Sequence, residues 1–202
     1  MGTIDRGQSS ETRSVRDAFS MGNLPSPVLI VGAAHSGKSE LAITALDRGR
    51  EALVIGTADV QEASFAARIN ELKALRPGHW RHLETSSDLP GVLARAVAEF
   101  PQILIDSLSQ WVAARLIHDT GKYDLAQMEE RLAVDRAELL RTIGSASQRI
   151  VLVTSEVGAG TTPPTGLERL YRQQCGRLNL ELGKAAASVV LVSAGVPLIM
   201  KG

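Results

Sequence analysis

The stretch VLIVGAAHSGKSELA, from Val28 to Ala42, decides the fold class of this chain. An apolar run comes first, the pattern G-x-x-x-x-G-K-S follows, and helix-like spacing comes after it. In such a loop the glycines let successive backbone N–H groups turn toward a phosphate chain. The lysine reaches the outer phosphates, and the serine hydroxyl can ligate Mg²⁺. We therefore expect a nucleotide-binding phosphate loop (P-loop) made of Gly32, Ala33, Ala34, His35, Ser36, Gly37, Lys38 and Ser39.

The composition is that of an ordinary globular protein and argues against several function classes. The 202 residues are 44% hydrophobic, enough for one domain with a sizeable core. Lys and Arg together number 22, as do Asp and Glu, so no net charge draws the chain to nucleic acid or to an anionic membrane. The single cysteine has no internal disulfide partner, and no apolar run approaches the roughly 20 residues that span a bilayer. We expect a cytoplasmic protein with no nucleic-acid partner and no stable membrane insertion.

The first 23 residues differ in character from the rest of the chain. They are polar, carry charges of both signs and lack the apolar core of a secretory signal. No internal repeat or long low-complexity stretch is present in the chain. We expect residues 1–23 to form a disordered or loosely docked extension and residues 24–202 to form a single P-loop α/β domain.

Short apolar runs predict a mostly parallel sheet, because strands that are covered on both faces carry continuous rather than alternating apolar residues. Segments with helical spacing separate these runs, which predicts an α/β fold with helices on both faces of the sheet. The apolar runs cover residues 27–32, 52–57, 102–106, 149–157 and 188–195, followed by an edge strand near the C-terminus entered through Pro197. The helical segments cover residues 38–48, 63–75, 88–99, 108–118, 125–143 and 167–187.

Two acidic residues that follow predicted strands are candidates for catalysis. Asp106 ends the run QILID, where a P-loop protein places the carboxylate that serves its metal ion. We assign Asp106 and Ser39 to a Mg²⁺ site, although an Asp at this junction can also simply cap the next helix. Glu156 ends another apolar run, and the carboxyl ends of parallel strands line the ligand crevice. Glu156 is therefore a candidate for binding metal, substrate or a neighbouring loop.

The segment RPGHWRHLET, residues 76–85, is predicted as a loop and concentrates unusual side chains. It contains two of the four histidines and one of the two tryptophans of the chain, together with two arginines. Such a loop could hold a nucleotide base or a substrate, with Arg on phosphate and His in proton or nucleophilic chemistry. Each histidine taken alone is more often a surface or packing residue. His79 and His82 are the candidate catalytic residues of this segment.

Seven segments of the chain occur in an order and spacing that resemble one enzyme family. They are GAAHSGKSELA, IGTADV, AARINELKALRPGHWRHLE, ILIDSLSQWV, VLVTSEVGAGTTPP, YRQQCGRLNLELGKAA and VVLVSAGVPLIMKG. Over roughly residues 27–202 the chain resembles the adenosylcobinamide kinase / adenosylcobinamide-phosphate guanylyltransferase family of cobalamin biosynthesis. The likeness extends well beyond the P-loop, which many unrelated nucleotide-binding proteins share.

This resemblance implies a two-step transferase that uses ATP or GTP with Mg²⁺ and acts on a corrinoid. Family members phosphorylate the aminopropanol hydroxyl of adenosylcobinamide and then transfer GMP from GTP to the new phosphate through a guanylylated histidine. They tend to be trimeric, so the resemblance implies a homotrimer. Besides residues 32–39, the nucleotide-contacting positions carried over are Thr57, Ala58, Asp59, Leu72, Lys73, Ala74, Leu75, Glu84 and Asp106.

Glu71 stands where the resembling family carries its guanylylated histidine, two residues after AARI. A carboxylate forms only a readily hydrolysed mixed anhydride with phosphate. Three hypotheses follow. The chain keeps both activities with His79 or His82 as the acceptor, or it keeps only the kinase step, which needs positioning and charge stabilisation rather than a covalent residue. The third hypothesis is a non-catalytic nucleotide-binding regulator.

Overall fold

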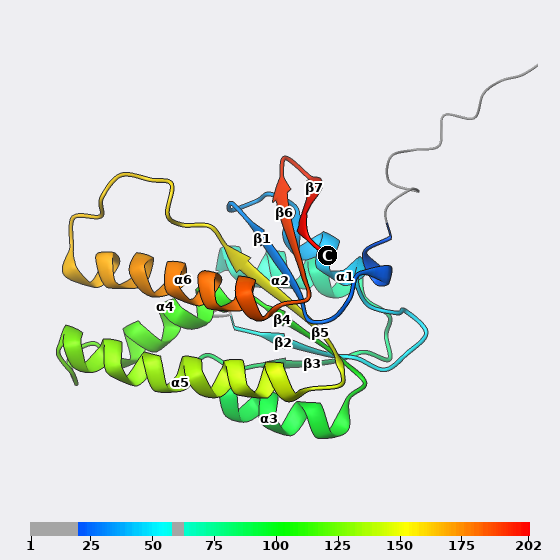
Figure 1. The fold of residues 1–202 in the computed structure, drawn as a ribbon, viewed down its shortest axis with the longest axis horizontal. Coiled ribbons are helices and arrows are strands. Elements are labelled where there is room, and N and C mark those ends of the chain that lie inside the picture. The colour runs from blue at the N-terminus through cyan, green and yellow to red at the C-terminus, as the bar shows by residue number, and fades with distance from the viewer. Residues whose placement is uncertain (1–19, 58–62) are drawn as a thin grey trace, which may run out of the picture.

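The computed structural model describes residues 20–57 and 63–202, along which strands and helices alternate except where α5 follows α4 and β7 follows β6 (Figure 1). A short 3-10 helix, η1 (Met21–Asn23), comes first. The strands are β1 (Val28–Gly32), β2 (Leu53–Gly56), β3 (Arg81–Glu84), β4 (Gln102–Asp106), β5 (Arg149–Ser155), β6 (Ser188–Ser193) and β7 (Val196–Lys201). The helices are α1 (Lys38–Thr44), α2 (Ala63–Ala74), α3 (Leu89–Glu99), α4 (Leu108–Asp119), α5 (Leu125–Ser145) and α6 (Gly166–Ala185).

The strands of the described residues form one sheet in the order β3-β2-β4-β5-β1-β6-β7. The neighbouring strands are parallel except for β6 and β7, which pair antiparallel. The predicted mostly parallel α/β fold with an edge strand near the C-terminus is confirmed. Because parallel strands run in the same direction, the carboxyl ends of β1, β2, β4 and β5 meet at one edge of the sheet, where ligands bind in this class of fold.

Alternate side chains of the central strands enter two hydrophobic cores, one on each face of the sheet. In β1, Leu29 packs into the first core, whereas Val28 and Ile30 pack into the second. In β4, Ile103 belongs to the first core and Leu104 to the second. The first core also contains side chains of α3, α4, α5 and α6, and the second contains side chains of α1 and the end of α2. Figure 1 shows α3, α5 and α6 together on one side of the sheet.

Strand β3 corrects the prediction that residues 76–85 form a loop throughout. Residues 81–84 pair in parallel with residues 53–56 of β2 and form the edge of the sheet opposite β7. Exposure alternates along β3, with Arg81 and Leu83 exposed and His82 and Glu84 partly buried. The strand escaped prediction because its inward-facing side chains are polar, so it has no apolar run.

Arg149, the first residue of β5, fastens the start of the described chain to the sheet. Its Nη2 donates to the carbonyl of Met21, its Nη1 to that of Leu24 and its Nε to that of Ala45, at 2.9, 2.9 and 2.6 Å. The side chain of Met21 is only 2% exposed and packs into the second core. The chain thus already contacts the sheet three residues before the predicted domain start, and the division into an extension and one domain stays a prediction.

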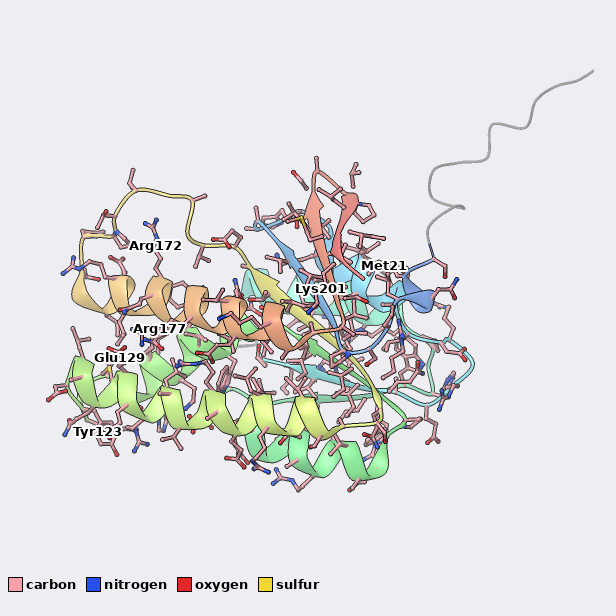
Figure 2. All side chains as sticks on the ribbon, in the orientation of Figure 1. Met21, Tyr123, Glu129, Arg172, Arg177 and Lys201 are labelled. Carbon is pink, nitrogen blue, oxygen red and sulfur yellow. The ribbon has the colours of Figure 1, made fainter. Side chains whose placement is uncertain are left out.

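The two longest helices, α5 and α6, pack against each other and are joined by ion pairs. Arg177 of α6 lies 2.7 Å from Glu129 of α5, and Figure 2 shows these two side chains together. Arg136 of α5 lies 2.9 Å from Glu181 of α6. Both helices carry charges along their length, and within residues 20–57 and 63–202 no helix is long and apolar enough to cross a membrane.

We predict that Arg149→Met lowers the free energy of unfolding by about 3 kcal/mol, because three buried carbonyls lose their donor at about 1 kcal/mol each. Equilibrium unfolding in urea measures this loss. Arg141→Met is the matched control, because the Arg141 side chain is 73% exposed and only 3.8 Å from Glu138, so its loss is about 0.5 kcal/mol or less. Equal losses in the two variants would show that Arg149 does not hold this segment.

Candidate active site

The P-loop connects β1 to α1 and has the backbone that a phosphate cradle requires. Gly37 has φ +90° and His35 has φ +56°, both in the left-handed region. A Cβ on Gly32 would lie 2.5 Å from Ser36 Oγ and 2.6 Å from the carbonyl of Val192, so only glycine fits there. The left-handed turns direct backbone N–H groups inward, and the N-terminus of α1 follows directly.

Side chains and a neighbouring hairpin hold the P-loop in place. Lys38 is 9% exposed, and its Nζ donates to the carbonyl of Ala33 at 2.9 Å. The carbonyl of Ser36 accepts from the N–H of Gly195, in the turn between β6 and β7, at 2.9 Å. The buried hydroxyl of Ser36 has no hydrogen-bond partner among the described residues. A buried polar atom of this kind in the cradle is available to a ligand.

Asp106 and Ser39 meet at the carboxyl edge of the sheet. Ser39 Oγ donates to Asp106 Oδ1 at 3.2 Å. The strand register places Asp106 beside Gly56 of β2 and Val153 of β5, which brings the end of β4 close to the P-loop. Burial raises the pKa of Asp106 above its ordinary value of 3.8, and the bond from Ser39 and the positive charges nearby only partly oppose that rise. The result is a poorly hydrated carboxylate oriented by a serine hydroxyl.

A cleft of about 330 Å³ lies over these residues and collects many of the predicted site positions. It runs from the P-loop across the ends of β2, β3 and β4. The predicted residues that line it are Ala34, His35, Ser36, Gly37, Lys38, Ser39, Leu72, His82, Glu84 and Asp106. Arg76, from the segment predicted to hold a base or substrate, also lines the cleft. The prediction omitted Glu40, Gly56, Ile69, Ser107, Gln110 and Ser155, which line it as well.

Arg76, His82 and Glu84 form a hydrogen-bonded wall on the β3 side of the cleft. Nη1 of Arg76 lies 3.0 Å from Nδ1 of His82, and Nε2 of His82 contacts Oε1 of Glu84. His82 and Glu84 are two residues apart on β3, so both point to the same face of the sheet. Buried atoms Arg76 Nε and Glu84 Oε2 have no hydrogen-bond partner among the described residues. This wall therefore offers a donor and an acceptor to a bound ligand.

Other predicted positions lie away from the cleft lining. Glu71 is exposed on α2, and Lys73, Ala74 and Leu75 are exposed at its end. His79 is exposed, with Nε2 lying 3.3 Å from the carbonyl of Arg50. The roles assigned to these residues stay predictions.

Three further predicted positions have local roles, and two lie outside the described residues. Glu156 is exposed, and its Oε1 accepts from the N–H of Gly158 at 2.6 Å. Thr57 is buried, and its hydroxyl donates to the carbonyl of Ser107 at 2.5 Å. Ala33 contributes its carbonyl to Lys38 rather than a side chain to the cleft. Ala58 and Asp59 lie outside the described residues.

Some of the omitted positions carried a signal in the sequence. Ser107 and Gln110 follow Asp106 directly at a strand end, where ligand-contacting residues gather. Asn179 of α6, which does not line the cleft, matches together with Arg177 a polar pair of the resembling family, and the resemblance assigns this pair no role. It accepts from Thr154 Oγ1 at 2.7 Å and donates to the carbonyl of Ser155 at 3.1 Å. Asn179 thereby fixes the end of β5 at the rim of the cleft.

The fold and the cleft define a P-loop nucleotide-binding protein of the α/β class, and solved structures agree. A prototypical ATPase from the type III secretion system of pathogenic bacteria superimposes with a TM-score of 0.51 at 14% identity, over 82% of this chain and 50% of that one. The chain thus spans half the length of that ATPase. The structure of PH0250 from Pyrococcus horikoshii OT3 gives a TM-score of 0.52 at 10% identity, over 87% and 85% of the two chains. These likenesses show the fold alone.

Sequence comparison shows the family. Residues 28–200 match the family described as cobinamide kinase / cobinamide phosphate guanyltransferase, and the chain belongs to it. It is 34% identical to the bifunctional adenosylcobalamin biosynthesis protein CobP of Pseudomonas aeruginosa over 86% of this chain and 96% of that protein. It is 32% identical to the bifunctional adenosylcobalamin biosynthesis protein CobU of Salmonella typhimurium over 86% and 99%.

We predict that Asp106→Asn stabilises the free protein at pH 8 and that the gain shrinks as the pH falls toward 4. The raised pKa means that the folded state holds this proton to higher pH than the unfolded state, so the wild type loses stability as the pH rises through that window. Removing the buried charge should raise Tm at pH 8 by on the order of 3 °C, roughly 1 kcal/mol in a chain of this size.

Thermal unfolding without nucleotide or metal measures this difference. Glu138→Gln is the control, because the Glu138 side chain is 45% exposed and its removal should leave Tm nearly unchanged at both pH values. A lower Tm for Asp106→Asn at pH 8 would mean that the wild-type carboxylate is net stabilising.

Proposed function

We propose that this chain phosphorylates a hydroxyl of a cobinamide-type corrinoid with ATP or GTP and then transfers GMP from GTP to the new phosphate, giving a corrinoid-GDP. The family to which the chain belongs is described by these two activities. Its similar proteins CobP and CobU are named as bifunctional proteins of adenosylcobalamin biosynthesis. The cleft brings together the P-loop, Ser39 and Asp106, which supports nucleotide binding and phosphoryl transfer.

The hydrogen bond from Ser39 to Asp106, beside Lys38, is the observation that carries the kinase step. Phosphoryl transfer requires mainly that the protein positions the reacting groups and stabilises the charge on the transferred phosphoryl group. Lys38 is nearly buried, so its positive charge acts in a medium of low dielectric constant on the oxygens of the transferred group. The P-loop N–H groups hold the phosphates in line with an acceptor hydroxyl that enters the open side of the cleft.

Ser39 and Asp106 fit a magnesium ion. Mg²⁺ prefers oxygen ligands and is usually bound through one or two protein groups together with substrate phosphates and water. That preference suits the cleft, because residues 20–57 and 63–202 contain no group of three His, Cys, Asp or Glu that could hold a metal by themselves. A Mg²⁺ ion held by Ser39 and Asp106 would supply positive charge to offset that of the nucleotide phosphates. Asp106 must be ionised to serve as a ligand, so its raised pKa shifts this role to higher pH.

The position on α2 that the resemblance assigns to the guanylyl acceptor offers no suitable nucleophile. Glu71 is exposed and does not line the cleft, and Leu72 lines it without a nucleophilic atom. A kinase that lacks the guanylyl step is therefore the second candidate function. In the third hypothesis, a regulator, the cleft would bind nucleotide without transferring any group.

The homotrimer implied by the family resemblance stays a prediction, which β7 supports. Along this edge strand the side chains of Val196, Leu198 and Met200 are 65, 58 and 62% exposed. An exposed apolar edge strand is a surface that proteins usually cover with another chain or element. We expect sedimentation equilibrium to give the mass of three chains, and Leu198→Lys to lower it. A monomer mass for the wild type at micromolar concentration would contradict the trimer.

We predict that Lys38→Ala lowers phosphoryl transfer to cobinamide by at least about 100-fold, because the charge that stabilises the transferred group is lost. Transfer of γ-labelled phosphate from ATP or GTP measures this step. Lys184→Ala is the control, because Lys184 is exposed at the end of α6, and its activity should equal that of the wild type. Full activity in Lys38→Ala would overturn the assignment of the P-loop. Nucleotide binding without any transfer by the wild type would favour a regulator.

A further inference from the structure

His82 occupies a place in the cleft that neither the P-loop nor the Mg²⁺ site explains. The chain has four histidines, and all four are described. His118 lies on α4, bonded to Asp119, and His79 lies outside the cleft lining. His35 lines the cleft from the P-loop itself, at an exposed position. His82 is thus the histidine that lines the cleft on a strand and also contacts a carboxylate.

Its hydrogen bonds determine which ring nitrogen of His82 carries the proton. The guanidinium of Arg76 can only donate, so Nδ1 of His82, 3.0 Å from Arg76 Nη1, must accept with its lone pair. Nε2 then carries the proton and donates to Glu84. This is a neutral imidazole with its reactive lone pair on Nδ1 and a carboxylate behind it, the arrangement that activates a histidine as a nucleophile or base.

Glu84 is held where it can balance the charge that such an imidazole gains when it reacts. Gly56 on the neighbouring strand packs directly against the Glu84 carboxylate, because a Cβ on Gly56 would lie 2.7 Å from Glu84 Cδ. The second carboxylate oxygen, Oε2, is buried and has no hydrogen-bond partner among the described residues. A carboxylate so fixed favours an adjacent positively charged ring, since buried opposite charges attract strongly.

Arg76 covers the lone pair of His82, but one of its own hydrogen-bond donors has no acceptor among the described residues. Its Nε is buried without a hydrogen-bond partner among the described residues. Burial lowers the pKa of Arg76, although the charges of Asp106 and Glu84 oppose this effect. A guanidinium binds phosphate oxygens through paired, charge-assisted hydrogen bonds, which are stronger than a single bond to a neutral ring nitrogen. A phosphate that enters the cleft therefore competes with His82 for Arg76.

We propose that Nδ1 of His82 is the guanylyl acceptor of this chain and that Arg76 covers it until a nucleotide phosphate draws the guanidinium away. The inference rests on the proposed guanylyl transfer and assigns the residue that performs it. Glu71 and Leu72 offer no such nitrogen, and His79 lies outside the cleft lining. The acceptor thus lies on β3 rather than on α2.

The transfer of GMP proceeds in two half-reactions. In the first, the Nδ1 lone pair of His82 forms a bond to the α-phosphorus of GTP, the bond from that phosphorus to the bridging oxygen breaks, and pyrophosphate leaves with the electron pair. The proton on Nε2 stays in the hydrogen bond to Glu84, whose charge balances the ring. In the second half, an oxygen of the corrinoid phosphate attacks the α-phosphorus, and the electron pair of the broken N–P bond returns to Nδ1.

Peptide mapping tests the assignment sharply, because trypsin separates the candidates. Cleavage after Arg81 and Arg95 gives a peptide of residues 82–95 in which His82 is the only histidine. His79 falls in residues 74–81, since the bond between Arg76 and Pro77 resists trypsin, and Glu71 falls in residues 69–73. The full chain is incubated with α-labelled GTP and Mg²⁺ without corrinoid, denatured at alkaline pH, digested and analysed by mass spectrometry.

We expect one GMP on residues 82–95, stable to base and labile to acid, and released by a phosphorylated corrinoid. His82→Gln keeps an N–H donor for Glu84 but has no imidazole, so its adduct should fall to about 1% of the wild-type level or less. His79→Gln is the matched control and should keep the adduct. Label on residues 69–73 or 74–81, or an undiminished adduct in a folded His82→Gln, would overturn the assignment.

The outcome separates this inference from the proposed function. If the wild type transfers γ-phosphate to cobinamide but carries no GMP, the inference fails and the kinase stands. If residues 82–95 carry GMP without phosphoryl transfer, the inference stands and the kinase step fails. If neither phosphoryl transfer nor a GMP adduct is detected, the inference and the proposed function both fail.

The covering role of Arg76 has its own test. Without nucleotide, Arg76→Gln should let diethyl pyrocarbonate modify residues 82–95 faster than in the wild type, because Nδ1 is uncovered. Modification of residues 74–81, which contain His79, should proceed at the same rate in both proteins. An unchanged rate on residues 82–95 would show that Arg76 does not cover His82.

Discussion

The hydrogen bond from Ser39 to Asp106 ties the start of α1 to the end of β4, although β5 lies between β1 and β4 in the sheet. It forms only if three parallel strands keep their register, so the geometry of the cleft depends on the whole central sheet. It also fixes the charge pattern around it. A buried carboxylate needs positive neighbours, and Lys38 and Arg76 provide them. Lys38 and Arg76 stabilise the buried carboxylate of Asp106. Their positive charges also attract the phosphates of a nucleotide that enters the cleft.

The sequence predicts the central sheet well because short stretches of neighbouring residues determine each of its strands and the P-loop. Strands such as β1 and β4 bury both faces, so each reads as a continuous apolar run, and the glycines of the P-loop occur at a spacing set by backbone geometry. The edge strand β3 was not predictable in this way. Its inner face carries His82 and Glu84 instead of apolar side chains, so the sequence has no apolar run that would predict a strand there. The contacts of Asn179 join segments far apart in the sequence, and no local sequence pattern predicts such contacts.

Strand geometry explains how a cleft of this kind can hold more than one chemistry. Successive side chains of β3 alternate between the faces of the sheet, so His82 and Glu84 face the cleft while Leu83 faces the other way. Helix α2 reaches the same cleft through Ile69 and Leu72. Two elements, β3 and α2, thus contribute side chains to the lining of one cleft.

The turn between β6 and β7 bears on the order in which the protein acquires its binding site during synthesis. The N–H of Gly195 donates to the carbonyl of Ser36, and β6 is the direct neighbour of β1 in the sheet. The P-loop is synthesised before these supports, which follow it far along the chain. A nascent chain therefore carries an incompletely supported P-loop until β6 and the turn after it have been made. The hydrogen bond that fixes the carbonyl of Ser36 forms only after residue 195 has been added.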